Sequence, residues 1–169
     1  MLHSNKRKEV YDAKNPHTLY RNRIQCSINI LANEIRAIAE KISHNPQVTP
    51  RVKNIEALRR KMRFYKTHNV SRINDVYGIR VLVASVSEVY AILERITKAF
   101  HGYLEHDYIA NPKTRPNDPA LEGKVLRLLQ FIAYRNGVPF EIQITTYEFH
   151  AMNELLHEAY HKRKYDGLE

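Results

Sequence analysis

The dipeptide Asn136-Gly137 constrains the fold more than any other feature of this sequence, because it separates two β-prone runs. Asn-Gly is a favoured two-residue hairpin turn. The flanking runs, Val125 to Tyr134 and Val138 to Thr145, are therefore predicted to pair as antiparallel strands. A third run, Val76 to Ala84, is apolar and β-branched, which predicts a buried strand. The chain must build a sheet.

Amphipathic helices are predicted around these strands. From His17 to Ser43 apolar residues recur every three to five positions, and Asn45-Pro46 ends the pattern. Further helices are expected over 54–65, 87–100 and 147–164, with a strand over 103–109 and a proline-rich loop over 111–123. Helices flanking a sheet that contains one hairpin indicate an α+β domain with a mixed β-sheet. We expect a single domain over 17–165, preceded by a loose polar segment, 1–16.

The charge balance points to an anionic partner. The chain has 27 Lys and Arg against 18 Asp and Glu, a formal charge of +9, which favours nucleotide, RNA or anionic lipid. Cys26 is the only cysteine, which excludes an intramolecular disulfide and a thiolate metal cluster and fits a reducing cytosol. No apolar run approaches the ~20 residues of a membrane span. The expectation is a cytoplasmic protein without a membrane partner.

Two acids lie in β-prone runs, where a charge is costly unless it has a partner. Asp75 directly precedes the strand that begins at Val76, and Glu141 alternates with Phe140 and Ile142. Two carboxylates at strand positions in a basic chain indicate a divalent cation and a phosphorylated ligand. The alternative is a pair of edge-strand acids in ordinary salt bridges.

A basic segment precedes these strands. Lys53 and Lys61 would share one side of a helix if the segment were helical throughout, and Arg51 lies just before them. A fixed row of cations can hold a triphosphate, and arginine can stack on a base. A solvated basic helix face is the alternative. Arg80 and Asp75 bracket the strand entrance, where they could bind phosphate and metal or simply pair with each other.

Further polar residues follow on the loop and on the later strands. Lys113 opens the proline-rich loop, where a lysine can grip an incoming phosphate. Glu141 and Gln143 point the same way because side chains alternate along a strand. Glu141 could accept a proton from an attacking hydroxyl, and Gln143 could bond to a base or ribose. His157 and His161 are four apart, a spacing that can bind metal but is more often part of a basic helix face.

Four segments, taken in order, resemble the synthetase domain of the RelA/SpoT family. They are RVKNIEALRRKM, INDVYGIRVLV, DYIANPK and GVPFEIQITT with its following helix ending HEAYHKRK, and they cover most of residues 51–165. The family moves the β,γ-diphosphate of ATP onto the 3′-hydroxyl of GTP or GDP, making pppGpp and ppGpp. The resemblance implies a nucleotidyltransferase-like fold, Mg²⁺ as cofactor, and ATP with GTP or GDP as ligands.

The resemblance also implies roles on the donor side. Arg51 and Arg80 would sandwich the adenine of ATP. Lys53 and Lys61 would hold its phosphates. Each is a positioning or charge-neutralising role, which in-line phosphoryl transfer requires.

At the reaction centre the resemblance implies that Asp75 binds Mg²⁺ and that Glu141 binds Mg²⁺ or activates the 3′-hydroxyl. Lys113 and Gln143 would face the acceptor nucleotide. The two acids are thus the implied catalytic and metal-binding residues.

The acceptor half departs from the family pattern. After the lysine motif the family continues into a Gly-Tyr-x-Ser-x-His block whose tyrosine stacks on guanine, whereas here no tyrosine or histidine follows until Tyr134. Loss of an aromatic platform removes roughly 1–3 kcal/mol of stacking. Arg115 and Arg127 are candidates to replace it. His106 stands where the family usually has a basic residue before the DYI sequence.

These departures leave three classes of function open. The first class is an enzyme. It would be either an alarmone synthetase or a relative that diphosphorylates an adenosine nucleotide or the 3′ end of tRNA, as toxic small members do. The second class is an inactive descendant that binds nucleotide or RNA, and the third is a basic RNA-binding domain. Small members are often oligomers, so the resemblance allows a homo-oligomer.

Overall fold

The computed structural model of the chain describes residues 16–69, 72–114 and 122–165. In chain order the elements are α2 (Pro16–Ala39), β1 (Gln47–Val52), α3 (Ile55–Phe64), β2 (Tyr77–Val83), α4 (Val86–Ala99), β3 (Gly102–Asp107), β4 (Lys113–Thr114), β5 (Val125–Leu126), β6 (Leu129–Arg135), β7 (Val138–Thr146) and α5 (Tyr147–Tyr165). The segment predicted to be loose, 1–16, lies outside the described residues except for Pro16.

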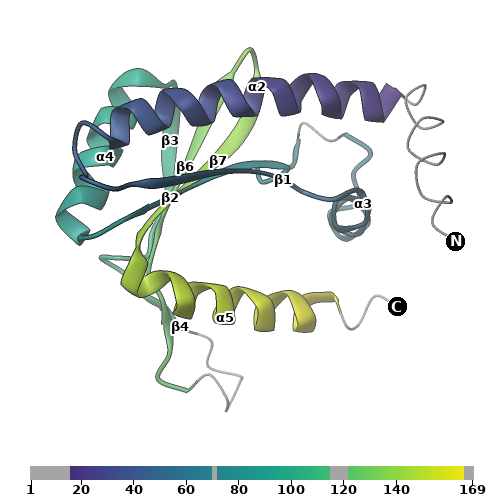
Figure 1. The fold of residues 1–169 in the computed structure, drawn as a ribbon. Helices are drawn as coiled ribbons and strands as arrows, with labels where there is room; N and C mark the ends of the chain where they lie inside the picture. The colour runs from purple at the N-terminus through teal and green to yellow at the C-terminus, as the bar shows by residue number, and fades with distance from the viewer. Residues whose placement is uncertain (1–15, 70–71, 115–121, 166–169) are drawn as a thin grey trace, which may run out of the picture.

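One five-stranded sheet organises the molecule, in the order β1-β2-β7-β6-β3. β2 and β7 run parallel, and the other neighbours are antiparallel. Helices α2 and α4 lie along one face of the sheet, and α5 lies on the other side (Figure 1). The predicted α+β fold, a mixed β-sheet flanked by helices, is confirmed. β4 and β5 form a separate two-stranded sheet.

The predicted hairpin is present. Asn136 and Gly137 both have positive φ, 52° and 76°, and Arg135 pairs with Val138 across the turn. These are the backbone angles of a type I′ turn. The strand predicted over 125–134 instead divides into β5 and β6. Both backbone groups of Arg127 bond to the Asn153 side chain on α5, at 2.9 and 2.8 Å, which interrupts the strand there.

The core lies between the sheet and the pair α2 and α4. Strand alternation sends every second side chain of β2 and β7 into it, and these are essentially inaccessible to water: Ile79, Val81, Val83, Ile142 and Ile144. Ser85 and Glu88 form a reciprocal capping box that starts α4. The opposite face of the sheet is left for polar side chains.

The region before β2 differs from its prediction. The sequence indicates no strand over 47–52, yet β1 forms there and pairs with β2. Pro50 lies within it, which an edge strand tolerates because its outer N–H groups need no partner. The helix after it begins at Ile55, capped by the Asn54 side chain, so Lys53 precedes the helix and is not part of it.

One other boundary shifts. The first helix ends at Ala39, earlier than the predicted Ser43, and passes into turns.

In the part of the chain that the structure describes, no helix combines the length and the apolar composition that crossing a membrane requires.

Candidate functional site

Polar side chains from five strands share the face of the sheet that α2 and α4 leave uncovered. The register aligns one row across β1, β2, β7, β6 and β3: Thr49, Arg80, Gln143, Gln130 and His106. The adjacent row contains Arg51, Gly78 and Glu141. Pairing of the strands therefore brings together side chains that are far apart in sequence.

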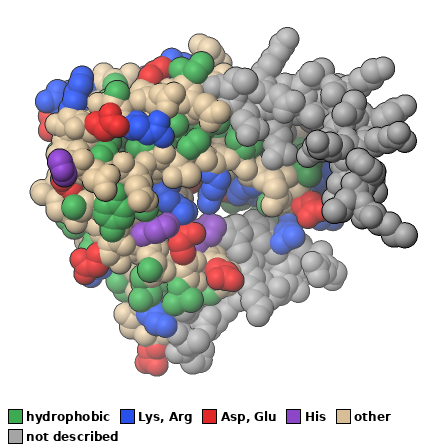
Figure 2. All heavy atoms as spheres, viewed as in Figure 1, with side chains coloured by type: hydrophobic (Ala, Val, Ile, Leu, Met, Phe, Trp, Pro, Cys, Tyr) green, Lys and Arg blue, Asp and Glu red, His purple; other side chains and the backbone are tan. Residues whose placement is uncertain are grey.

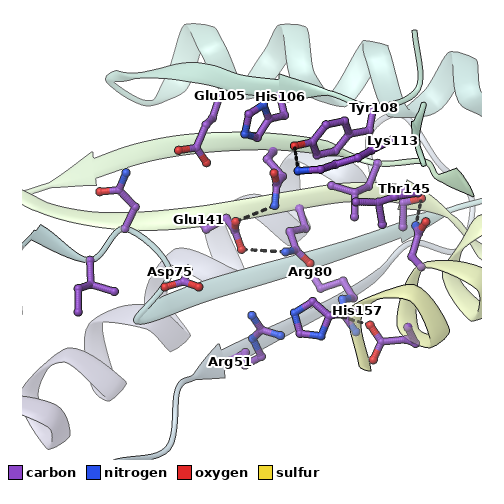
Figure 3. Close-up of a pocket in the computed structure, with 18 of the residues that line it drawn as sticks. Arg51, Asp75, Arg80, Glu105, His106, Tyr108, Lys113, Glu141, Thr145 and His157 are labelled. Carbon is purple, nitrogen blue, oxygen red and sulfur yellow. Dashed lines mark hydrogen bonds and ion pairs between the residues drawn. The ribbon is translucent and has the colours of Figure 1, made fainter. Parts of the chain in front are cut away.

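A cavity of about 440 Å³ opens on this face beside α5. Seven of the eight predicted site residues line it: Arg51, Lys61, Asp75, Arg80, Lys113, Glu141 and Gln143. Figure 3 labels five of them and shows Lys113 on one side of Glu141 and Arg51 on the other. Figure 2 shows basic and histidine side chains gathered in a hollow. The eighth, Lys53, reaches the site by bonding to Asp75. A smaller cavity of about 250 Å³ shares Arg51, Arg80, Glu141 and Gln143 with it.

Asp75 is held by two lysines on a single oxygen. The Nζ atoms of Lys53 and Lys61 lie 2.8 and 2.5 Å from Asp75 Oδ2. Burial alone would raise the pKa of Asp75, but the charges and hydrogen bonds of the two lysines outweigh it and lower the pKa to about 2. Burial lowers the pKa of Lys53, against the charge of Asp75. The structure thus holds Asp75 as an anion.

Glu141 lies in a contrasting environment on the central strand. It is 6% exposed, and its two oxygens accept hydrogen bonds from Gln130 Nε2 at 3.0 Å and Gln143 Nε2 at 2.8 Å. Burial raises the pKa of Glu141, and the negative charge of Asp75 raises it further. Carboxyl groups with opposite pKa shifts in one cavity are typical of catalytic and metal-binding pairs.

The two acids fit a divalent cation. Asp75 Oδ1 is buried and has no hydrogen-bond partner within the described ranges, so an oxygen ligand is available beside Glu141. Hard carboxylate oxygens are what Mg²⁺ prefers. Among those same residues, no three His, Cys, Asp or Glu side chains could hold a metal ion by themselves. A cation here would complete its coordination with water and phosphate oxygens, as Mg²⁺ commonly does.

The arginines lie on the β1 and β2 side of the cavity. Arg80 Nη2 pairs with Glu154 Oε1 on α5 at 2.8 Å. The alternative pair of Arg80 with Asp75 is not formed, because the Arg80 guanidinium is directed to Glu154 instead. Arg51 extends over Gly78, its Nε 3.8 Å from where a Cβ would stand.

On the opposite side of the cavity the predicted Lys113 joins His106 and Tyr108, whose stacking the sequence reasoning missed. The rings of His106 and Tyr108 stack with their centroids 4.7 Å apart and 19° between planes. Lys113 Nζ donates to the Tyr108 hydroxyl at 3.2 Å. All three line the cavity, as do Glu105 and His157. The sequence feature that could have revealed this stacking is the pair of aromatic residues two positions apart, His106 and Tyr108, at the start of the DYIANPK segment.

Of the two arginines considered as replacements for a stacking tyrosine, the structure describes only Arg127. Arg127 places its guanidinium 5.4 Å from the Phe149 ring centroid, so its cation is engaged there. Arg115 lies outside the described residues. The side chain of His161 also lies outside them, so the spacing of His157 and His161 stays a prediction.

The fold is that of small alarmone synthetases. Small alarmone synthetase 1 from Bacillus subtilis superposes with a TM-score of 0.67 at 20% identity, over 89% of this chain and 81% of that one. Its structure bound to its product pppGpp gives 0.61 at 21%, over 92% and 83%. A GTP pyrophosphokinase family protein from Streptococcus pneumoniae gives 0.56 at 23%, over 80% and 72%.

The sequence itself matches a family model. The model describes a region found in RelA and SpoT proteins, and it matches residues 50–166. This range runs from within β1 to the end of α5 and holds every predicted site residue. With well over half of its length matched and the predicted resemblance confirmed, the chain belongs to the RelA/SpoT family.

Proposed function

We propose that this protein transfers the β,γ-diphosphate of ATP to the 3′-hydroxyl of GTP or GDP, making pppGpp or ppGpp. The observation that supports it most is that Asp75 and Glu141 line one cavity and that their pKa values shift in opposite directions. Arginines flank them on one side and the Lys113 cluster on the other. Two substrates can therefore meet at the acids.

The donor nucleotide belongs on the β1 and β2 side. Arg51 and Arg80 offer planar cations for the adenine there. Lys53 and Lys61 carry the charge to hold its phosphates, once these replace the Asp75 carboxylate as their partner. Mg²⁺ held by Asp75 and Glu141 would supply charge neutralisation for the transferred diphosphate.

Glu141 is positioned to take the proton of the attacking hydroxyl. Its raised pKa makes it a stronger base than an exposed carboxylate. Gln130 and Gln143 fix its orientation, and each carboxylate oxygen retains a lone pair for a substrate hydrogen bond. Lys113 and Gln143 lie on the acceptor side, where they could contact its phosphate and sugar.

A second candidate acceptor is the 3′ end of tRNA. The outer face of α3 and the segment just after it are basic, with Arg59, Arg63, Lys66 and His68 exposed around a further cavity of about 740 Å³. Such a surface attracts a phosphate backbone. It lies on the element that supplies Lys61 to the site.

The experiment is diphosphate transfer with γ-labelled ATP, Mg²⁺ and one acceptor at a time: GTP, GDP, ATP or deacylated tRNA. We expect labelled GTP or GDP. Asp75→Asn and Glu141→Gln should each lower the rate at least about 100-fold. Glu40→Gln, an exposed acid beyond the end of α2, is the matched control and should retain the wild-type rate.

Label on tRNA alone would favour the second acceptor. Binding of ATP without transfer to any acceptor would contradict an enzymatic role and support the inactive descendant. A wild-type rate in Asp75→Asn or Glu141→Gln, with the fold intact by circular dichroism, would contradict the roles given to these acids.

A further inference from the structure

A β-bulge on the edge strand turns two neighbouring side chains toward the cavity. Leu104 pairs with Phe131 and His106 pairs with Gln130, so Glu105 has no partner residue on β6. In a regular strand Glu105 and His106 would face opposite sides of the sheet. Both instead line the cavity, and Figure 3 shows them together at its edge. Bulges next to active sites commonly redirect a side chain in this way.

The His106 ring is held as a flat surface. Tyr108 stacks on it and is itself packed against Leu126 and Leu128, which form a small apolar cluster with α5. His106 is exposed, whereas Tyr108 is half-buried. An aromatic ring fixed from behind and open in front is suited to stacking on a nucleobase.

The Glu105 carboxylate completes this surface. It is exposed, and the structure gives it no hydrogen bond from the residues it describes. A carboxylate accepts from two donors at once. Guanine presents two adjacent donors, N1–H and the 2-amino group, whereas adenine presents an acceptor beside its amino group. A carboxylate next to a stacking ring therefore favours guanine.

The position of this pair suits the acceptor. β3 is the edge of the sheet opposite β1, and Glu141 lies on β7 between them. Two strand spacings, roughly 10 Å, separate β7 from β3, a distance that one nucleoside can bridge. Lys113 lies beside Tyr108, where it can meet a phosphate.

We propose that His106 and Glu105 form the base site for the acceptor and that Glu105 selects guanine over adenine. The assignment of this base to an acceptor rests on the proposed function. The guanine site itself can be tested without turnover. It supplies the aromatic platform that the missing loop tyrosine would otherwise provide.

The test is calorimetric binding of GDP, IDP and ADP to the full chain saturated with Mg²⁺ and α,β-methylene-ATP, which blocks the donor side. IDP lacks the 2-amino group. The wild type should bind GDP more tightly than IDP or ADP. Glu105→Gln should weaken GDP binding roughly 5- to 150-fold and reduce the preference over IDP. Affinity for the ATP analogue should not change.

His106→Ala should weaken GDP and IDP alike, roughly 5- to 150-fold, and His106→Phe should restore binding because it keeps the ring. His44→Ala and Glu40→Gln are matched controls, exposed beyond the end of α2, and should bind as wild type. Thermal unfolding of each variant checks the fold.

The inference is overturned if Glu105→Gln keeps the wild-type ratio of GDP to IDP affinity, or if the blocked wild type binds ADP as tightly as GDP. Transfer to GTP that neither variant affects would also overturn it, while leaving the proposed function standing. Guanine binding that depends on Glu105, without any transfer, would support the site and refute the reaction.

Discussion

One oxygen of Asp75 contacts two lysines, and its other oxygen has no hydrogen-bond partner among the residues that the structure describes. Its position just before β2 was predictable from the sequence, because a charged side chain in an apolar run is costly unless it has a binding partner. Its partners were not, since Lys53 and Lys61 meet it only through the turn from β1 into α3. The residue identities of the site followed from motifs, whereas their pairing required the fold.

This arrangement predicts an acid-sensitive contribution to stability. The pKa of Asp75 falls from an ordinary 3.8 to about 2 on folding. The stabilisation is complete above about pH 5, is lost as the pH falls through about 2, and amounts to about 2 kcal/mol. Urea unfolding from pH 6 to 2.5 should show the wild type losing this advantage over Asp75→Asn. A constant difference across that range would contradict it.

At the scale of elements, the two edges of the sheet were the hardest to predict. β1 carries Pro50, which reads as a strand breaker, and its pairing with β2 is visible only in three dimensions. The bulge in β3 has no signature in a single sequence, so Glu105 and His106 were not recognised as neighbours in the site. The central hairpin and β2 were predictable because apolar runs and an Asn-Gly turn specify them locally.

The attachment of β3 depends on Gly102. A Cβ there would lie 2.1 Å from the carbonyl oxygen of Ile132 and 2.9 Å from Ala133 Cα, so backbone must move. Gly102→Ala should lower the free energy of unfolding by roughly 2–4 kcal/mol. Gly78→Ala is the control, because its Cβ would make contacts no closer than 3.7 Å. Equal urea midpoints for the two variants would contradict this account.

At the scale of the whole molecule, the layers separate packing from chemistry. α2 and α4 bury one face of the sheet, and the other face carries the polar rows. Amphipathic periodicity predicted the layers, and the charge of +9 predicted an anionic ligand. Neither the periodicity nor the net charge predicts that the basic side chains divide between the cavity and the outer face of α3. That division depends on how α3 is oriented relative to the cavity.

The basic face of α3 predicts salt-dependent binding of polyanions. Arg59→Glu with Arg63→Glu should weaken tRNA binding at least about 10-fold and flatten its dependence on salt, measured by filter binding from 50 to 200 mM NaCl. GDP binding should not change, since neither residue lines the main cavity. Unchanged tRNA affinity would remove this face as a polyanion surface.

The two rows of polar side chains across the sheet have a consequence for which parts of the site tolerate change. Arg80 and Arg51 stand near one edge, His106 near the other, and Glu141 on the strand between. Edge strands tolerate bulges and prolines that central strands do not. Under the proposed function, substitution or insertion at β3 would therefore change which acceptor binds, while Arg51, Arg80 and Glu141 keep their positions.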